Sequence, residues 1–311
     1  MEYLIFAISM LALTKGADFV IEEAERIALH YRISHFIIGA TLVALGTSLP
    51  EMAASMVASF QHKSDLAISN VIGSTIYNIA LVLGLVFLIA RAIMPKRDIF
   101  AKDSAWALFP ILTFLVIGFD GEMDRFEGFL FTVMMGAYVL FLVRYDRSVH
   151  EEIDETLLKE AFDWKKTVPM LIGGFVLLIV GANYTVESAS VIARSFGVSE
   201  WVIGLLLVAL GTSLPELMVS ISAARKGNAD MIIGNIIGSN VANFTIVLGA
   251  SAMVRPLTID YAANAFDILS ALVVTIMLVF MSANKLYNKS AGLVLLIMMA
   301  LVLEHSFKAF G

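Results

Sequence analysis

Long apolar segments recur along the whole chain, and shorter polar segments separate them. Segments of about 20 apolar residues are typical of helices that cross a membrane. The pattern therefore predicts an all-α polytopic membrane protein with ten transmembrane helices. The predicted spans are 3–27, 35–60, 66–90, 104–119, 126–143, 167–193, 201–224, 231–254, 263–282 and 290–307.

The two halves of the chain repeat each other at one constant offset. Residues 46–51 (Gly-Thr-Ser-Leu-Pro-Glu) recur without change as residues 211–216, 165 positions later. At the same offset Asn78 aligns with Asn243, and residues 70–74 align with 235–239. Each half holds five predicted spans, so the second half must enter the membrane in the opposite orientation. Such inverted repeats, with broken helices at the midplane, are typical of secondary transporters.

This repeat divides the chain into three parts. Residues 1–145 form the first five-helix repeat, 146–166 a charged cytoplasmic linker, and 167–311 the second, inverted repeat. The linker is acidic in its middle and basic at its ends. We expect it to be a solvated connecting helix; a calcium-sensing segment is the alternative.

Positive charges favour one orientation of the ten spans. With both termini outside, 15 of the 21 Lys and Arg residues lie on the cytoplasmic side, as the positive-inside rule requires. The exceptions are Lys63, Arg125, Arg194, Arg255 and Lys308 on the outer side and Lys15 within the first span. We therefore expect a plasma-membrane protein with N-out and C-out termini, whose first apolar run is retained as a helix.

Composition excludes several other classes. The chain is 59% hydrophobic and 15% charged, whereas soluble domains carry about 25% charged residues. No basic stripe indicates nucleic-acid binding. The chain has no Cys, and its 5 His residues show no zinc-binding spacing. We expect no cofactor and no obligatory protein partner.

Each repeated motif interrupts an apolar run with helix-breaking and polar residues. Proline removes one N–H group and frees the carbonyl four residues before it, here those of Gly46 and Gly211. Unpaired backbone groups at membrane depth are tolerated only where they line a cavity within the protein. The two breaks therefore predict a polar cavity inside the membrane.

Glu51 and Glu216 end the two motifs and are the leading candidates for chemistry. An ionisable residue inside a membrane span indicates a functional site. Two buried carboxylates placed together require positive charge, supplied by a metal ion or by protons. Flexible oxygen ligands suit Ca²⁺ better than Mg²⁺, while transition metals prefer His or Cys. The alternative is that the Pro-Glu pairs only cap broken helices.

Further polar residues extend this candidate site. Hydroxyl groups come from the motifs themselves, at Thr47, Ser48, Thr212 and Ser213. Ser74 and Asn78 lie four residues apart and share a helix face, as do Ser239 and Asn243. Asn70 and Asn235 lie one turn earlier. The alternative for these residues is polar contact between helices.

Two further acids lie in the first span of each half. Glu22 aligns with Glu187 at the same offset of 165 residues. In one interpretation the two acids line an access path for ions or protons. In the other interpretation they form an acidic helix end near the membrane interface.

At these motifs the sequence resembles the α-repeats of the cation/Ca²⁺ exchanger superfamily. The matching residues are 44–51 with 70–78, and 209–216 with 234–243. The resemblance implies a membrane antiporter that exports Ca²⁺ against Na⁺ or H⁺ by alternating access, the first helix of each half sliding against the others. It implies that Ca²⁺ is held by the carboxylates of Glu51 and Glu216 and by main-chain oxygens of Thr47 and Thr212. The implied counter-ion sites add Ala44, Ser48, Ser74, Asn78, Ala209, Ser213, Ser239 and Asn243.

One departure from the family pattern concerns the counter-ion. Many Na⁺/Ca²⁺ exchangers of the superfamily have Asp at the position of Asn243, and in this respect the sequence resembles the Ca²⁺/H⁺ exchanger branch. Two carboxylates neutralise one Ca²⁺ or take up two protons, whereas several Na⁺ ions would leave excess positive charge. We therefore predict Ca²⁺/H⁺ exchange, with Na⁺/Ca²⁺ exchange at the same site as the alternative. A channel is disfavoured by the occluding breaks, and an enzyme by the lack of a nucleophile–base pair.

Overall fold

The computed structural model describes residues 1–90, 93–146, 163–197 and 209–310, and these residues are almost entirely helical. The chain divides into two compact units. Unit 1 comprises Met1–Thr47 and Leu142–Asn235, and unit 2 comprises Ser48–Phe141 and Ile236–Gly311. Each unit therefore combines segments from both halves of the sequence. The predicted linker 146–166 lies mostly outside the described residues.

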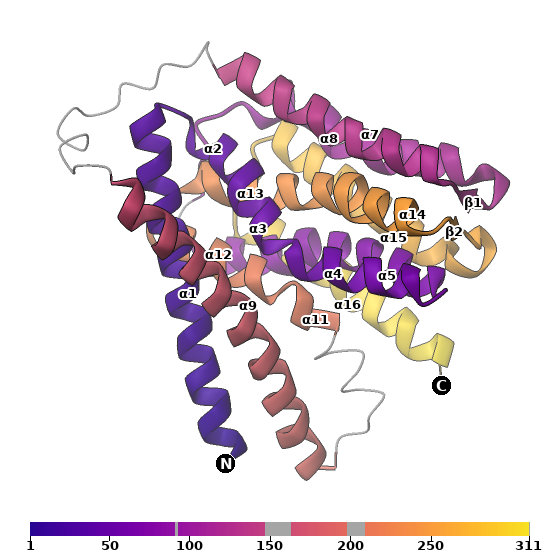
Figure 1. Ribbon diagram of the computed structural model, residues 1–311, viewed down its shortest axis with the longest axis horizontal. Coiled ribbons are helices and arrows are strands. Elements are labelled where there is room, and N and C mark those ends of the chain that lie inside the picture. The colour runs from indigo at the N-terminus through magenta and orange to yellow at the C-terminus, as the bar shows by residue number, and fades with distance from the viewer. Residues whose placement is uncertain (91–92, 147–162, 198–208, 311) are drawn as a thin grey trace. The chain divides into compact units, whose positions relative to one another are not determined.

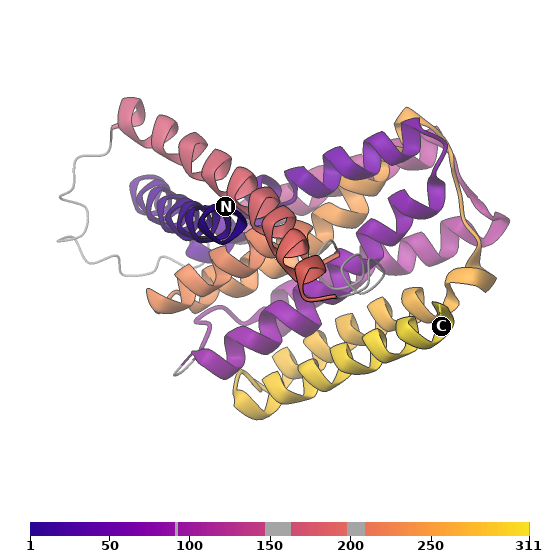
Figure 2. The ribbon, with the colours of Figure 1, turned by 90° about the horizontal axis from the view of Figure 1, so that it is seen from below.

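Unit 1 is built around two long helices that pack against each other. They are α1 (Glu2–Tyr31) and α9 (Trp164–Ser195), which lie side by side in both ribbon views (Figures 1 and 2). Glycine permits this close approach, because a Cβ atom on Gly16 would lie 2.6 Å from the backbone nitrogen of Leu178. The shorter elements of unit 1 are α2 (His35–Ile38), the π-helix η1 (Gly39–Val43), α3 (Ala44–Thr47), α11 (Ala209–Thr212), α12 (Leu214–Arg225) and the start of α13 (Ala229–Ala242).

Unit 2 holds most of the remaining helices. They are α4 (Leu49–Phe60), α5 (Ser64–Ile76), the π-helix η2 (Tyr77–Leu83), α6 (Gly84–Ile89), α7 (Ile99–Ile117), the 3₁₀-helix η3 (Gly118–Asp120), most of α8 (Arg125–Asp146), the end of α13, the π-helix η6 (Asn243–Leu248), α14 (Gly249–Val254), α15 (Tyr261–Ala283) and α16 (Lys289–Phe310). Helices α15 and α16 run side by side (Figures 1 and 2). Most of the core of unit 2 surrounds η2 and η6, where side chains such as Ile79 and Leu248 are completely buried.

A short strand pair joins two loops of unit 2. Strands β1 (Glu122–Met123) and β2 (Leu257–Thr258) are antiparallel, with Glu122 opposite Thr258 and Met123 opposite Leu257. The ladder continues to the backbone N–H of Ile259, which donates to the carbonyl of Gly121. The sequence does not predict these strands, because two residues are too few for an alternating pattern.

Among the described residues, eight helices are long and apolar enough to cross a membrane. The number rises to nine if His35–Thr47 and Leu49–Phe60, bent by 46° at their junction, form one span. The predicted span 201–224 begins outside the described residues, so the described part of the chain does not reach the ten predicted spans. The helical, membrane-type fold is confirmed, while the tenth span stays a prediction.

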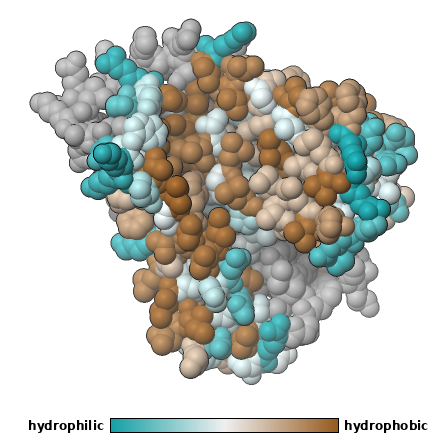
Figure 3. Space-filling view, viewed as in Figure 1, coloured by the Kyte–Doolittle hydropathy of each residue, from teal (hydrophilic) through white to brown (hydrophobic). Residues whose placement is uncertain are grey.

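The surface distribution of apolar side chains fits contact with lipid. In Figure 3 apolar residues cover much of the visible face, and hydrophilic residues gather at the edge where Figure 1 places β1 and β2. Large apolar side chains such as Leu4, Phe129 and Ile172 are more than half exposed. Exposed apolar area of this extent is rare on soluble monomers but is normal for a lipid-facing surface.

Candidate ion-binding site

Each repeated motif forms a break between two helices. Helix α3 ends at Thr47 and α4 begins at Leu49, while α11 ends at Thr212 and α12 begins at Leu214. The residue at each break has nearly the same backbone conformation, with φ −83° and ψ 4° at Ser48 and φ −88° and ψ 1° at Ser213. The prediction of two broken helices in the same register is therefore what the local structure shows.

The two candidate carboxylates occupy equivalent positions after these breaks. Glu51 lies in the first turn of α4 and Glu216 in the first turn of α12, directly after Pro50 and Pro215. Each glutamate is 1% exposed. The unpaired N–H groups and the positive dipole end of a helix favour negative charge in the first turn. That effect is small beside the cost of burying a carboxylate, so positions of this kind suit the binding of a cation or a proton.

The motif glycines bring both breaks close to α9 in unit 1. A Cβ atom on Gly46 would collide with the ring of Phe175, and one on Gly211 would lie 2.7 Å from a methyl group of Val186. Helix α3 also contacts α12 within this unit. The segment that carries Thr47 therefore lies against the helix that carries Glu216.

Asn70 holds the start of α4 in place within unit 2. Its amide nitrogen donates to the backbone carbonyl of Glu51 at 3.1 Å and to the hydroxyl of Ser55 at 2.8 Å. The hydroxyl of Ser55 in turn donates to the carbonyl of Ala67 on α5. These bonds fix the backbone around Glu51 relative to α5.

Buried amides from both halves of the sequence lie in unit 2, on η2, α13 and η6. The Nδ2 atom of Asn78 donates to Oδ1 of Asn240 at 3.1 Å. Asn78 and Asn243 are each 1% exposed. Within the described part of the chain, Oδ1 of Asn78 and both polar atoms of the Asn243 amide have no hydrogen-bond partner. Since buried polar groups nearly always have partners, these oxygen atoms suit a bound cation.

Both amides also belong to irregular helix. Asn78 lies in η2, and Asn243 begins η6. A π-helical turn is often found at a functional site, because it re-aims side chains and loosens the backbone bonding. Helix α4 packs against both α5 and η6, so the element that carries Glu51 lies beside the one that begins at Asn243.

The remaining predicted site residues are mostly buried. Ser48, Ser74, Ser213 and Ser239 are at most 3% exposed, and Ala44 and Thr47 are fully enclosed. The hydroxyl of Thr47 donates to the carbonyl of Ala44 at 3.2 Å. Thr212 is half-buried, and Ala209 is the first residue of α11. Asn235 is fully buried, and both polar atoms of its amide have no hydrogen-bond partner within the described residues.

The two acids assigned to an access path are not brought together. Glu22 forms an ion pair with Lys226 at 3.3 Å, at the end of α12. Nearby, Asp18 accepts a hydrogen bond from Ser222 at 2.7 Å. Glu187 is exposed on α9. Glu22 therefore helps to attach α1 to α12, and the access-path role of both acids stays a prediction.

Sequence reasoning missed one polar residue of this region, Asn240. Its position aligns with Thr75 in the first repeat, so Asn240 is not one of the residues that are identical in both halves. The signal for it in the sequence is an amide side chain within an apolar run, three residues before Asn243. Residues three apart share a helix face.

The candidate ligand atoms at these residues are all oxygens, which are hard ligands. Among the described residues, no group of three or more His, Asp or Glu side chains is arranged to hold a metal ion. A cation at these breaks would therefore rely on neutral amide, hydroxyl and carbonyl oxygens beside its carboxylates. Such a set matches the ligand preferences of Ca²⁺ and Na⁺ rather than those of transition metals.

Broken, polar helices in an apolar helical fold define a secondary-transporter type of membrane protein. The chain belongs to the sodium/calcium exchanger protein family, whose model matches residues 1–144 and 166–308. The resemblance drawn from the sequence motifs is thereby confirmed. The chain is an exchanger-family membrane protein and not an enzyme.

Relatives and solved structures agree with this assignment over nearly the whole chain. The sodium/calcium exchanger MaX1 of Methanosarcina acetivorans is 32% identical, with 95% of each chain covered. The inner membrane protein YrbG of Escherichia coli is 34% identical, covering 86% of this chain and 85% of its own. A structure of the sodium-calcium exchanger NCX_Mj, soaked with zero Na⁺ and Ca²⁺, is 30% identical and superimposes with a TM-score of 0.82 over 98% of both chains.

Proposed function

We propose that this chain is a secondary antiporter that exports Ca²⁺ in exchange for H⁺ by alternating access. Ca²⁺ and protons compete for Glu51 and Glu216. The observation that carries the proposal is the burial of both carboxylates, each 1% exposed and each in the first turn of a helix that follows a break. That both carboxylates bind the same ion is inferred from the repeated motif.

The assignment of Ca²⁺ as substrate is supported by ligand chemistry and by the relatives. In this proposal the two carboxylates and the main-chain oxygens of Thr47 and Thr212 bind Ca²⁺, and the remaining buried hydroxyl and amide oxygens complete the shell. MaX1 is named a sodium/calcium exchanger, and structures of NCX_Mj were obtained with Ca²⁺, Sr²⁺ and Na⁺.

The assignment of H⁺ as counter-ion rests on charge balance. Asn78 and Asn243 are neutral, so Glu51 and Glu216 are the only carboxylates among the proposed ligands. One Ca²⁺ or two protons neutralise this pair completely. The second candidate is Na⁺/Ca²⁺ exchange at the same residues, and the names of MaX1 and NCX_Mj favour it.

Many transporters achieve alternating access with two structurally related halves, and the local structure supports that plan here. Helices α4 (Leu49–Phe60) and α12 (Leu214–Arg225) are related by the same offset of 165 residues as α6 (Gly84–Ile89) and α14 (Gly249–Val254). We infer ten spans in two inverted five-helix repeats, 1–145 and 167–311, in a plasma membrane with both termini outside. No protein partner is needed for this mechanism.

Uptake of ⁴⁵Ca²⁺ into proteoliposomes tests the function and its counter-ion. One batch is preloaded with acid and no Na⁺, and a second with Na⁺ at uniform pH; protein-free vesicles are the control. Uptake driven by the outward proton gradient alone establishes Ca²⁺/H⁺ exchange. Uptake driven only by internal Na⁺ replaces that proposal with Na⁺/Ca²⁺ exchange. The absence of gradient-driven Ca²⁺ uptake in both batches contradicts Ca²⁺ as substrate.

A further inference from the structure

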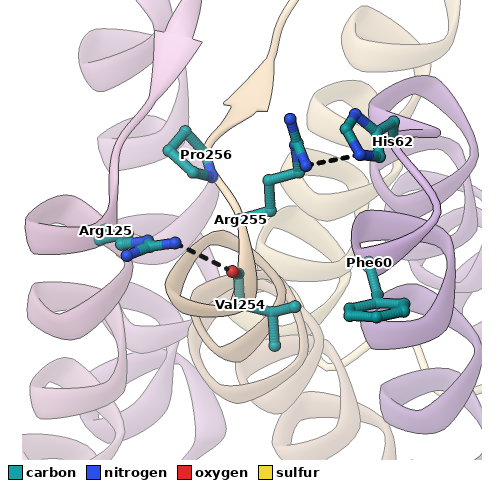
Figure 4. Close-up of a pocket in the computed structure, with 6 residues that line it drawn as sticks. All are labelled: Phe60, His62, Arg125, Val254, Arg255 and Pro256. Atoms are coloured by element: carbon teal, nitrogen blue, oxygen red, sulfur yellow. Dashed lines mark hydrogen bonds between the residues drawn. The ribbon is translucent and has the colours of Figure 1, made fainter.

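A basic pocket lies in unit 2, at the opposite end of α4 from the turn that carries Glu51. Its volume is about 510 Å³, and it is lined by Phe60, His62, Arg125, Val254, Arg255 and Pro256 (Figure 4). The lining residues come from the end of α4, the start of α8 and the segment that joins α14 to β2. Three segments distant in sequence thus place two guanidinium groups and an imidazole around one cavity.

The strand pair and one serine set the positions of these segments. Arg125 follows β1 and Arg255 precedes β2, so the antiparallel ladder limits how far the two arginines can separate. The hydroxyl of Ser59 donates to the carbonyls of Ser251 and Arg255, at 2.7 and 3.2 Å. The end of α4 is thereby attached to the end of α14. The pocket is therefore preorganised by backbone contacts that do not involve its basic side chains.

The basic side chains themselves keep most of their hydrogen-bonding capacity. One nitrogen of Arg255 contacts Nε2 of His62 at 2.6 Å, and one nitrogen of Arg125 reaches the carbonyl of Val254 at 3.5 Å (Figure 4). A guanidinium group has five N–H donors, so each arginine retains several. Because a guanidinium group can only donate, Nε2 of His62 is the acceptor in the first contact.

Neither arginine has an acidic partner in the described part of the chain. By contrast, Arg97 and Arg26 are each paired with a carboxylate. The acids beside the pocket are engaged elsewhere: Asp124 and Glu127 each accept the other's backbone N–H, at 2.7 and 2.8 Å, at the start of α8. Two guanidinium groups around one cavity, neither with a carboxylate partner, suit the binding of an anion.

We propose that this pocket binds a phosphate-type oxyanion, which is either the head group of an anionic phospholipid or a free phosphate. Guanidinium groups match the geometry of phosphate oxygens better than ammonium groups do. The pocket opens beside apolar side chains at the helix ends, where Phe60 is 75% exposed and Phe126 is 64% exposed. Aromatic and basic residues together at a helix end are typical of the membrane interface, where lipid phosphates lie.

Two binding measurements on purified, delipidated protein separate the two sources. The first is native mass spectrometry with dioleoylphosphatidylglycerol, compared with dioleoylphosphatidylcholine, which has a phosphate but no net charge. The second is calorimetric titration with inorganic phosphate. The variants are Arg125→Ala and Arg255→Ala, and the matched control is Lys63→Gln, which removes a positive charge next to His62 but outside the lining. Arg125→Lys and Arg255→Lys keep the charge if an alanine variant fails to fold.

We expect the wild type to retain phosphatidylglycerol in preference to phosphatidylcholine. Each alanine variant should bind it roughly tenfold more weakly, since a charge-assisted hydrogen bond is lost, while Lys63→Gln stays within about twofold. The lysine variants should be intermediate. Phosphate binding with the same variant dependence, and no lipid preference, would assign the pocket to a free oxyanion. Failure of both ligands to bind, or an equal loss in Lys63→Gln, would overturn the proposal.

Discussion

The side-chain amide of Asn78 donates a hydrogen bond to the side-chain oxygen of Asn240, 3.1 Å away, although the two residues lie in different halves of the sequence. Both are nearly fully buried, at 1% and 6% exposure. This bond joins η2 to α13 in unit 2 and fixes the orientation of the Asn78 amide. The oxygen of Asn78 is then the atom left for a ligand.

Replacement of Asn240 by Ala should therefore affect both stability and ion binding. The change leaves the buried amide of Asn78 unpaired, which costs about 1–3 kcal/mol in the free energy of unfolding. We expect a lower Tm and weaker Ca²⁺ binding, measured by thermal unfolding with and without Ca²⁺. Asn284→Ala is the control, because the Asn284 amide is exposed and bonds only to Phe280 of its own helix. An Asn240→Ala variant with the wild-type Tm would contradict this role.

Glu51→Gln and Glu216→Gln should each abolish most coupled Ca²⁺ uptake. Glutamine keeps the size of the side chain but removes one negative charge and one proton-binding group. The remaining carboxylate cannot neutralise Ca²⁺ alone in a buried site. Uptake of ⁴⁵Ca²⁺ measures the effect, and Glu304→Gln on the exposed side of α16 serves as the control. Near-normal exchange in either Gln variant would contradict the proposed site.

Asn243→Asp should change which gradient drives transport. The substitution adds a third carboxylate at a fully buried position that begins η6. Three carboxylates can neutralise three monovalent cations, whereas two carboxylates can neutralise only two. We expect Na⁺-driven Ca²⁺ uptake to rise relative to H⁺-driven uptake in the paired proteoliposome assay. The control is Asn284→Asp, which adds one carboxylate at an exposed position outside the proposed ligands. An unchanged ratio in Asn243→Asp would remove Asn243 from the choice of counter-ion.

The helical fold and the two breaks could be predicted from the sequence because their signals are local. An apolar run interrupted by Gly, Pro and Glu is visible without any knowledge of distant contacts. Helix ends were predicted less well: the span predicted as 104–119 belongs to α7, which begins at Ile99. Hydropathy marks the part of a helix in hydrocarbon, whereas Asp98 caps this helix outside the apolar segment through a bond to Ala101.

Contacts between residues distant in sequence could not be predicted, for a different reason. The bond from Asn78 to Asn240 depends on how two helices pack, and no repeat or spacing encodes it. The same holds for β1 and β2, whose pairing brings Arg125 and Arg255 to one pocket. The division into two units, each drawn from both halves of the chain, also depends on such contacts.

Asp103→Asn should strongly destabilise unit 2. Both oxygens of Asp103 accept hydrogen bonds from Arg97, at 2.6 and 3.0 Å, and the two side chains are 0% and 6% exposed. Removing one member of a buried ion pair leaves an uncompensated charge and costs about 3–5 kcal/mol. Thermal unfolding in detergent measures the loss. The double variant Arg97→Met/Asp103→Leu should lose much less, because no charge stays buried; an equal loss would contradict the charge argument.

Two glycines on α9 allow a matched test of the close packing between α1 and α9. A Cβ atom on Gly181 would lie 2.7 Å from the backbone nitrogen of Leu13, whereas one on Gly173 would meet nothing within 4 Å. Alanine is about 1 kcal/mol more favourable than glycine inside a helix, so Gly173→Ala should leave the Tm unchanged or raise it. Gly181→Ala carries the same helix preference but forces two backbones apart, which costs about 1–3 kcal/mol. We therefore expect a lower Tm for Gly181→Ala alone, and equal Tm values for the two variants would show that α1 and α9 do not pack this closely.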